Sequence, residues 1–525
     1  MRRLPLLLPW VCLLMWRPAQ ADQGLKRLTT DVEYLLEAQA TASSDRTPLW
    51  LNANKFGLSS LDRTNGYGRA SLVRPLRADT LRRWGVGYGV DVAVPFHFSS
   101  NVVVQQAFVE GRWWHAALTV GSKEWLMELY NNELSSGAQT LGINARPVPQ
   151  VRLSLPQYWT LPVGNDWIHV KGHVAFGRMS DDNWQHDFTQ YWTDYTDRLL
   201  YHSKAGYLKI GNEERFFPWS LELGLEMATQ FGGTAHLMQP DGTVATVQGG
   251  TGWKDYWHAF LPGGNDAVET GTAYENIEGN QLGSWMLRLN YEGDLWDVHL
   301  YGEHFFEDHS SMFMLDYDGY GQGDAWNTRA KRRYFMYDLK DMMLGAELNW
   351  KYGTWLRSLL LEYIYTKYQS GPVYHDHGPG MSDHLGGVDD YYNHGIYPGW
   401  QHWGQVMGNP LYRSPLYNGD NSIMSKNNRF WAFHLGASGQ PTEALHYRLL
   451  ATFQQSFGTY LQPYRKPFSN AYGLAEVTYA PQNKWRGWSV RGALGLDFGK
   501  TVGCNQGFQL TIARRGIFNK TWREE

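Results

Sequence analysis

The residues between Gln369 and Asn428 combine flat aromatic rings with planar polar side chains. A sugar ring presents apolar C–H faces between rims of hydroxyl groups, so a sugar site needs aromatic platforms beside hydrogen-bond donors and acceptors. We expect Trp400 and Trp403 to be such platforms. The candidate sugar-binding residues of this segment are Asp389, Tyr391, Tyr392, Asn393, His394, Trp400, His402 and Trp403. The alternative is a loop that packs its own aromatic rings, because ordered loops both pack and carry function.

A second stretch, residues 179–199, repeats the same chemistry. Its candidate sugar-binding residues are Asp181, Asp182 and Trp184. The alternative for this stretch is a solvated acidic loop with aromatic residues at a membrane interface. The sequence therefore predicts a second sugar-contacting segment.

His375 and His377, with aspartates nearby, have the ligand types that suit zinc, copper or nickel. The spacing alone is weak evidence, because histidine has many other uses in proteins. We therefore expect no metal site and no cofactor.

The elements that must position these residues show the alternation of β-strands. Residues 84–98 alternate between an apolar set, which runs from Trp84 to Phe98, and a small or polar set that includes Asp91. This alternation is longer than most strands of soluble proteins. Residues 219–231 and 488–499 repeat it. An apolar set of alternate residues with aromatic residues at its ends suits a lipid-facing surface, and the polar set suits a water-filled lumen.

The links between the predicted strands alternate in length, as they do in outer-membrane barrels with short periplasmic turns and long external loops. The longer links are residues 179–199, 232–283, 307–341, 369–428 and 459–470. The eighteen predicted strands are residues 28–42, 66–77, 84–98, 102–112, 115–122, 150–156, 167–178, 200–211, 219–231, 284–291, 295–306, 342–352, 355–368, 429–437, 445–458, 471–479, 488–499 and 507–518.

An even number of strands closes a sheet without leaving an unpaired edge, which the hydrocarbon core would not tolerate. The sequence thus predicts an all-β chain over residues 22–525: a closed antiparallel transmembrane β-barrel of about 18 strands. Residues 369–428 are expected to be a long external loop. Residues 43–65, which do not alternate cleanly, are a possible plug in the lumen.

Composition excludes several other classes. Residues 1–21 have the basic start, apolar stretch and small-residue site of a secretory signal, so we expect them to be removed. They carry three arginines and no acid, so the formal charge of −4 becomes −7, which disfavours nucleic acid as a partner. Cys504 is then the one remaining cysteine, which excludes an internal disulfide. With a mean hydropathy of −0.48, no later segment reads as a membrane-spanning helix.

Several segments together resemble the capsule-assembly Wzi family of outer-membrane proteins, and the resemblance covers most of the mature chain. Its specificity comes from many matches in one order. The matching segments are residues 47–51, 56–60, 121–124, 133–137, 144–150, 181–184, 391–394 and 400–404.

The resemblance implies an eighteen-stranded barrel that acts as a lectin and retains exported capsular polysaccharide or exopolysaccharide at the cell surface, without catalysis. Enterobacterial members of the family also carry a helical bundle at the periplasmic end, whereas here residues 32–40 alternate as a strand. The expected location is the outer membrane of a Gram-negative bacterium. The expected partners are the polysaccharide, membrane lipid and lipopolysaccharide, and the protein is expected to be monomeric.

Two other functions remain as alternatives. A sugar-selective porin would have an open lumen. A barrel hydrolase would use lumen acids such as Glu222 and Glu226, but a barrel interior presents such pairs routinely. Because no nucleophile stands in a recognisable activated setting, we expect no enzyme.

Overall fold

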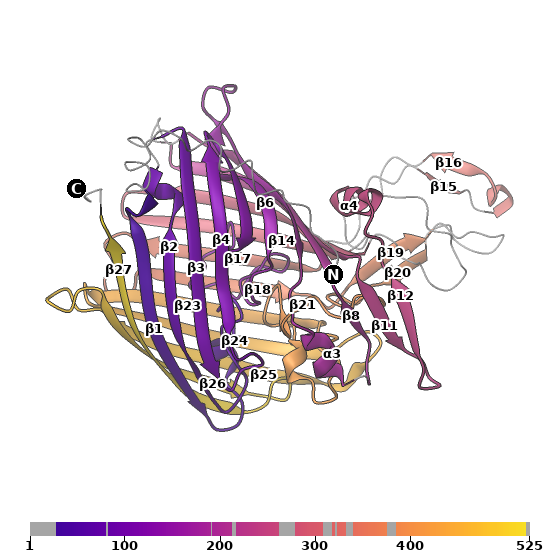
Figure 1. Cartoon of the computed structure of the whole chain (residues 1–525). Helices are drawn as coiled ribbons and strands as arrows, with labels where there is room; N and C mark the ends of the chain where they lie inside the picture. The colour runs from indigo at the N-terminus through magenta and orange to yellow at the C-terminus, as the bar shows by residue number, and fades with distance from the viewer. Residues whose placement is uncertain are drawn as a thin grey trace, which may run out of the picture.

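The computed structural model of the chain describes residues 28–79, 82–190, 192–212, 217–261, 279–307, 318–320, 323–331, 340–374 and 385–520 (Figure 1). The predicted signal segment lies outside these residues. No helix within the described ranges has the length and apolar character needed to cross a membrane.

Eighteen strands form one antiparallel sheet, and the sheet closes because β1 pairs with both β2 and β27 (Figure 1). The strands are β1 (Val32–Ser43), β2 (Thr64–Arg74), β3 (Trp84–Phe96), β4 (Val103–Trp113), β5 (Ala116–Ser122), β6 (Gln150–Thr160), β7 (Ile168–Arg178), β9 (Leu200–Ile210), β10 (Trp219–Phe231), β13 (Asn280–Glu292), β14 (Trp296–Glu307), β17 (Met342–Trp350), β18 (Ser358–Tyr365), β23 (Phe430–Thr442), β24 (Leu445–Gly458), β25 (Pro463–Tyr479), β26 (Trp488–Phe498) and β27 (Asn505–Phe518). The predicted closed barrel of about 18 strands is therefore confirmed.

The two faces of the sheet differ as the alternation predicts. On β3, Val90 and Val94 are 56% and 64% exposed, whereas Asp91 between them is 1% exposed. On β26, Leu494 is 57% exposed and Asp497 is 1% exposed. The exposed apolar face has the character of a lipid-covered surface, and the polar face lines the lumen.

The two ends of the barrel differ in their links. The end at which β1 begins and β27 ends, here called the terminal end, has short links such as residues 293–295 and 443–444. The opposite end, here called the loop end, carries the long links, so the predicted alternation holds. One loop-end link is shorter than expected, because β25 begins at Pro463 and leaves only residues 459–462 before it. Pro463 and Pro467 break the alternation that marked the rest of β25.

Smaller elements belong to the loop-end links, apart from η2 at the terminal end. Figure 1 shows β11, β12, β15, β16, β19, β20 and α4 outside the barrel, on its right. These elements are α2 (Leu49–Asn52), η2 (Leu76–Asp79), α3 (Trp184–Thr189), β8 (Tyr195–Asp197), β11 (Thr234–Met238), β12 (Val244–Gln248), α4 (Trp253–Phe260), β15 (Asp318–Tyr320), η4 (Gly323–Ala325), β16 (Arg329–Lys331), β19 (Ser370–Tyr374), β20 (Leu385–Val388), β21 (Gln401–His402), β22 (Gln405–Val406) and η5 (Pro415–Tyr417).

Candidate functional site

Three of the loop-end links fold back into the lumen. We call residues 44–63, 123–149 and 389–428 the first, second and third plug segments. For each segment, a buried carboxylate on the barrel wall accepts a hydrogen bond from a backbone N–H group. These bonds run from Leu49 N to Asp497 of β26 (3.1 Å), from Ser136 N to Glu362 of β18 (2.9 Å) and from Tyr392 N to Glu307 of β14 (3.1 Å). Buried N–H groups need partners, so the wall carboxylates hold the plug in place.

The plug segments also bind one another through asparagine side chains. The Nδ2 groups donate to backbone carbonyls: Asn54 to Ser136 (3.0 Å), Asn409 to Gly137 (2.6 Å) and Asn144 to Val406 (2.9 Å). Trp50, Leu134 and Tyr412, one from each segment, belong to a single buried cluster that includes wall residues such as Phe305. Residues 44–63, which lie within the 43–65 segment considered above as a plug, thus pack against wall residues and against two further segments.

Of residues 369–428, predicted above as an external loop, β19 and β20 lie outside the barrel, whereas residues 389–428 are largely buried (Figure 1). Tyr391, Tyr392 and Trp400 are all 0% exposed. The ring of Tyr392 stacks on Tyr412 with a centroid separation of 4.1 Å, and Trp400 lies 6.1 Å from the ring of Tyr201 on β9. A sugar needs a free ring face, so this burial corrects the expectation that Trp400 is an open platform. The ring packs the plug against the wall instead.

The predicted polar partners in this segment serve the plug itself. Asn393 donates from Nδ2 to Ser425 O (2.9 Å) and accepts from Ser425 N (2.7 Å). Nδ1 of His402 lies 2.8 Å from Arg146 O, to which it donates. Burial lowers the pKa of His394 and His402 to about 4, so both imidazoles are neutral at pH 7.

Part of the predicted set does remain accessible. Trp403 is partly exposed, and the guanidinium of Arg146 lies 4.2 Å from the centre of its ring, so a cation covers part of that platform. Asp389 and His394 are also partly exposed. These three residues are the part of the predicted site in residues 389–403 that a ligand at the loop end could touch.

The 179–199 link closes over the third plug segment. Trp184 is buried, stacks on Phe188 at 4.6 Å and lies against Gly404, where a Cβ atom would come within 2.6 Å of the indole. Thr196 Oγ1 donates to Ile396 O (2.7 Å). The structure therefore brings the two predicted sugar segments together, with Trp184 as a packing residue.

Of the two acids in this link, Asp182 is exposed and Asp181 is partly exposed. Partial burial raises the pKa of Asp181 above its usual range. They lie on the loop-end face and are open to a ligand there.

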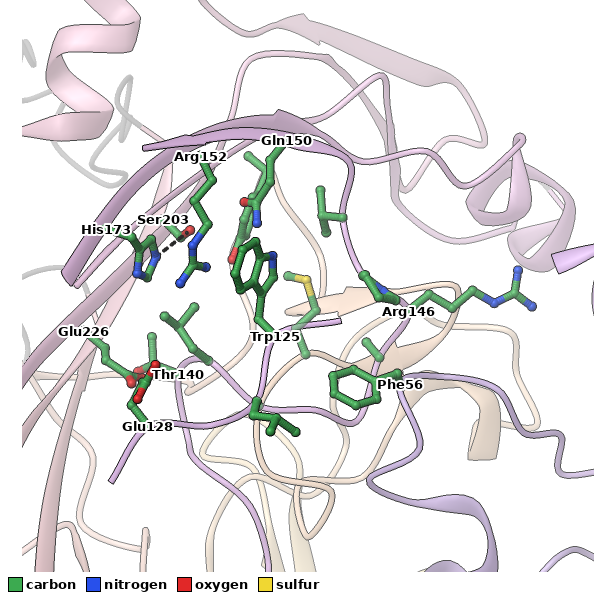
Figure 2. A pocket seen from close by; sticks show the side chains of 18 of the residues that line it. Phe56, Trp125, Glu128, Thr140, Arg146, Gln150, Arg152, His173, Ser203 and Glu226 are labelled. Carbon is green, nitrogen blue, oxygen red and sulfur yellow. Dashed lines mark hydrogen bonds between the residues drawn. The ribbon is translucent and has the colours of Figure 1, made fainter. Parts of the chain in front are cut away.

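A pocket that sequence reasoning missed lies between the second plug segment and the wall formed by β6, β7, β9 and β10 (Figure 2). Its cavity volume is about 90 Å³, and it is partly open to solvent. Its polar and aromatic lining includes Trp125, Glu128, Gln150, Arg152, His173, Ser203 and Glu226. Leu126 at its edge is 66% exposed, which shows that the space beside the plug is open. The alternation of β6 could have predicted that Arg152 faces the lumen. It could not have predicted which residues Arg152 contacts there.

Several polar groups in this pocket lack protein partners. Trp125 Nε1, Gln150 Oε1 and Arg152 Nε are buried and have no hydrogen-bond partner among the described residues. The Arg152 guanidinium lies 3.9 Å from the centre of the Trp125 ring. Unmatched donors and acceptors in an open pocket are the groups that a polar ligand would satisfy.

No group of three or more histidine, cysteine, aspartate or glutamate side chains is placed to hold a metal ion within the described ranges. His375 and His377 lie outside those ranges.

The barrel can be compared with proteins of known structure. The structure of Wzi from Escherichia coli aligns with 94% of this chain and 86% of its own, with a TM-score of 0.52 and 13% sequence identity. The fold is shared with Wzi. Wzi is described as an outer membrane protein involved in group 1 capsule assembly and as a carbohydrate-binding β-barrel. The resemblance seen in the sequence is thereby supported at the level of the fold.

Other solved barrels are also similar. OccK5 (OpdH) from Pseudomonas aeruginosa aligns with 93% of this chain and 98% of its own, at 8% identity and a TM-score of 0.44. OccAB4 from Acinetobacter baumannii aligns with 94% of this chain and 100% of its own, at 10% identity and a TM-score of 0.44. No protein-family profile and no curated protein matches the sequence.

Proposed function

We propose that this protein binds exported capsular polysaccharide or exopolysaccharide and retains it at the surface of a Gram-negative bacterium. In this proposal the mature barrel, freed of residues 1–21, sits as a monomer in outer-membrane lipid and lipopolysaccharide with its loop end outside. It holds the glycan without chemical turnover. The carbohydrate binding described for Wzi, which has the same fold, supports the proposal.

The observation that carries the proposal is a packed lumen beside an open polar pocket. A porin needs a continuous aqueous path, whereas here three segments enter the barrel and bond to buried wall carboxylates, where they would obstruct such a path. The pocket offers Trp125, Gln150 and Arg152, and the loop-end face adds Asp182 and Trp403. This combination favours a protein that retains a glycan over a channel that transports one.

Two measurements on the refolded barrel test the proposal together. On a glycan array it should bind a limited set of bacterial polysaccharide fragments, and in a planar bilayer it should conduct far less than an unplugged barrel of this size. Cells that lack it should release polysaccharide into the medium. High steady conductance without glycan affinity would instead support the sugar-selective porin, and release of shortened glycans would support the hydrolase.

The proposed orientation makes a prediction for Cys504, which is exposed in the 499–504 link at the loop end. A membrane-impermeant maleimide should label it on intact cells, because the loop end is proposed to face outside. The label is specific for this position, since Cys504 is the one cysteine left after signal removal. As a control, Asp294→Cys in a Cys504→Ser background places the thiol in an exposed terminal-end link. That thiol should react only after the outer membrane is permeabilised. The reverse pattern would invert the topology.

A further inference from the structure

We propose that the pocket in Figure 2 binds an acidic sugar residue, a uronic acid, through the guanidinium of Arg152. The inference rests on the proposed function and names the class of glycan. Arg152 is on β6, and its side chain enters the space between Trp125 of the plug and His173 of β7 (Figure 2).

Two donors of the pocket lack partners among the described residues. Arg152 Nε has no hydrogen-bond partner among the described residues, and the guanidinium lies 3.9 Å from the centre of the Trp125 ring. The Trp125 Nε1–H group is also unpaired. A guanidinium presents several N–H groups in a planar fork that matches a carboxylate. Arg152 is half-buried, so a guanidinium without a salt-bridge partner is unfavourable there and a carboxylate ligand would stabilise it.

Each acid of the same pocket accepts at least one hydrogen bond, although Glu226 Oε2 is buried and has no hydrogen-bond partner among the described residues. Glu128 accepts from Lys171 Nζ at 2.6 Å, and Glu226 accepts from Tyr207 Oη at 2.5 Å. The guanidinium of this pocket that lacks a salt-bridge partner among the described residues is that of Arg152, although Glu128 and Glu226 lie within its electrostatic range. This balance favours an anionic sugar over a neutral or amino sugar.

The neutral groups of the pocket suit the rest of a sugar. Gln150 Oε1 is an unpaired acceptor for a hydroxyl group, and Ser203 with His173 forms a polar wall, Ser203 Oγ lying 3.2 Å from His173 Nε2. An accommodated pyranose would thus place its carboxylate on Arg152 and a hydroxyl on Gln150.

The test compares tetragalacturonate with its carboxyl-reduced, neutral counterpart, using the full-length barrel refolded in detergent and calorimetric titration. Wild type should bind the acidic oligosaccharide on the order of tenfold more tightly or better, with the preference weakening as salt rises. Arg152→Gln should abolish the preference. Arg178→Gln should keep it, because Arg178 is an exposed arginine of β7 whose loss changes the net charge equally.

Each outcome decides the inference. Equal binding of the two oligosaccharides by wild type, or equal weakening of both by Arg152→Gln, would overturn it and leave the proposed function standing. Failure to bind any glycan on the array would overturn both. A folded barrel changes its mobility on a detergent gel when it is heated. If Arg152→Gln does not show this change, Trp125→Phe is the variant to test. Loss of the Nε1–H donor should weaken binding of the acidic oligosaccharide several-fold and binding of the neutral one little. Unchanged acidic binding in that variant would count against the inference.

Discussion

Replacing the three plug segments by short turns is expected to convert this protein into a conducting pore. Barrels of 16–18 strands enclose an aqueous channel unless something fills it, so conductance in planar bilayers should rise on the order of tenfold or more. The strands allow the excision because each plug segment belongs to a link between hydrogen-bonded neighbours, and the third excision removes the whole link from β18 to β23, including β19 and β20. The flanking pairs are Ala42 with Thr64, Gly121 with Gln150 and Tyr365 with Trp431.

Two-residue Asn-Gly turns are suitable replacements, since they join antiparallel strands with the correct twist. A matched control removes the projecting β11–β12 hairpin, residues 234–248, which lies outside the barrel (Figure 1). The control should conduct as little as wild type, and all variants should remain heat-modifiable on detergent gels. An excised barrel that still conducts poorly would show that another part of the chain blocks the lumen.

The barrel was predictable because its signal is local. Lipid on one side and a polar lumen on the other impose a two-residue period, so residues such as Val90, Asp91 and Val94 reveal their faces without knowledge of the fold. Strand ends were less predictable where β25 continues through Pro463 and Pro467. Prolines depart from the alternating pattern, and yet they are tolerated where the ladder does not need their N–H group.

The plug was only partly predictable because its core is polar. In a soluble protein, a segment rich in asparagine and histidine marks the surface, but a barrel lumen is lined by polar side chains that such residues can bond. Asn409, Asn427 and Asn428 are 0% exposed. Polarity therefore could not separate an external loop from a lumenal plug, and Trp400 was assigned to sugar stacking for the same reason.

The pocket escaped prediction for a different physical reason. Its chemistry arises where Arg152 of one strand meets Trp125 of a link, and the remaining walls come from three further strands. None of these residues forms a motif with its sequence neighbours. Only the folding of the second plug segment against β6 creates the site.

The second large effect is expected from the wall acids that hold the second plug segment. Glu303 accepts from Gln139 N (3.0 Å) and Tyr130 Oη (2.7 Å), and Glu362 accepts from Ser136 N (2.9 Å). Replacing both acids by alanine leaves these buried donors without partners, at about 1–3 kcal/mol for each. The docked state of the segment should therefore be destabilised by roughly 3–9 kcal/mol in free energy relative to a state in which the segment has left the wall.

Hydrogen exchange measures this loss directly, because an amide exchanges in proportion to the population of the state that opens it. The Ser136 and Gln139 amides should exchange at least about 100-fold faster in Glu303→Ala/Glu362→Ala, while amides of β24 remain protected. Glutamine at both positions retains a carbonyl oxygen as acceptor and should lose far less protection. Glu133→Gln, an exposed change in the same segment, should lose none. Wild-type exchange rates in the double alanine variant would mean that apolar packing of Leu134 and its neighbours, rather than the carboxylates, holds the plug.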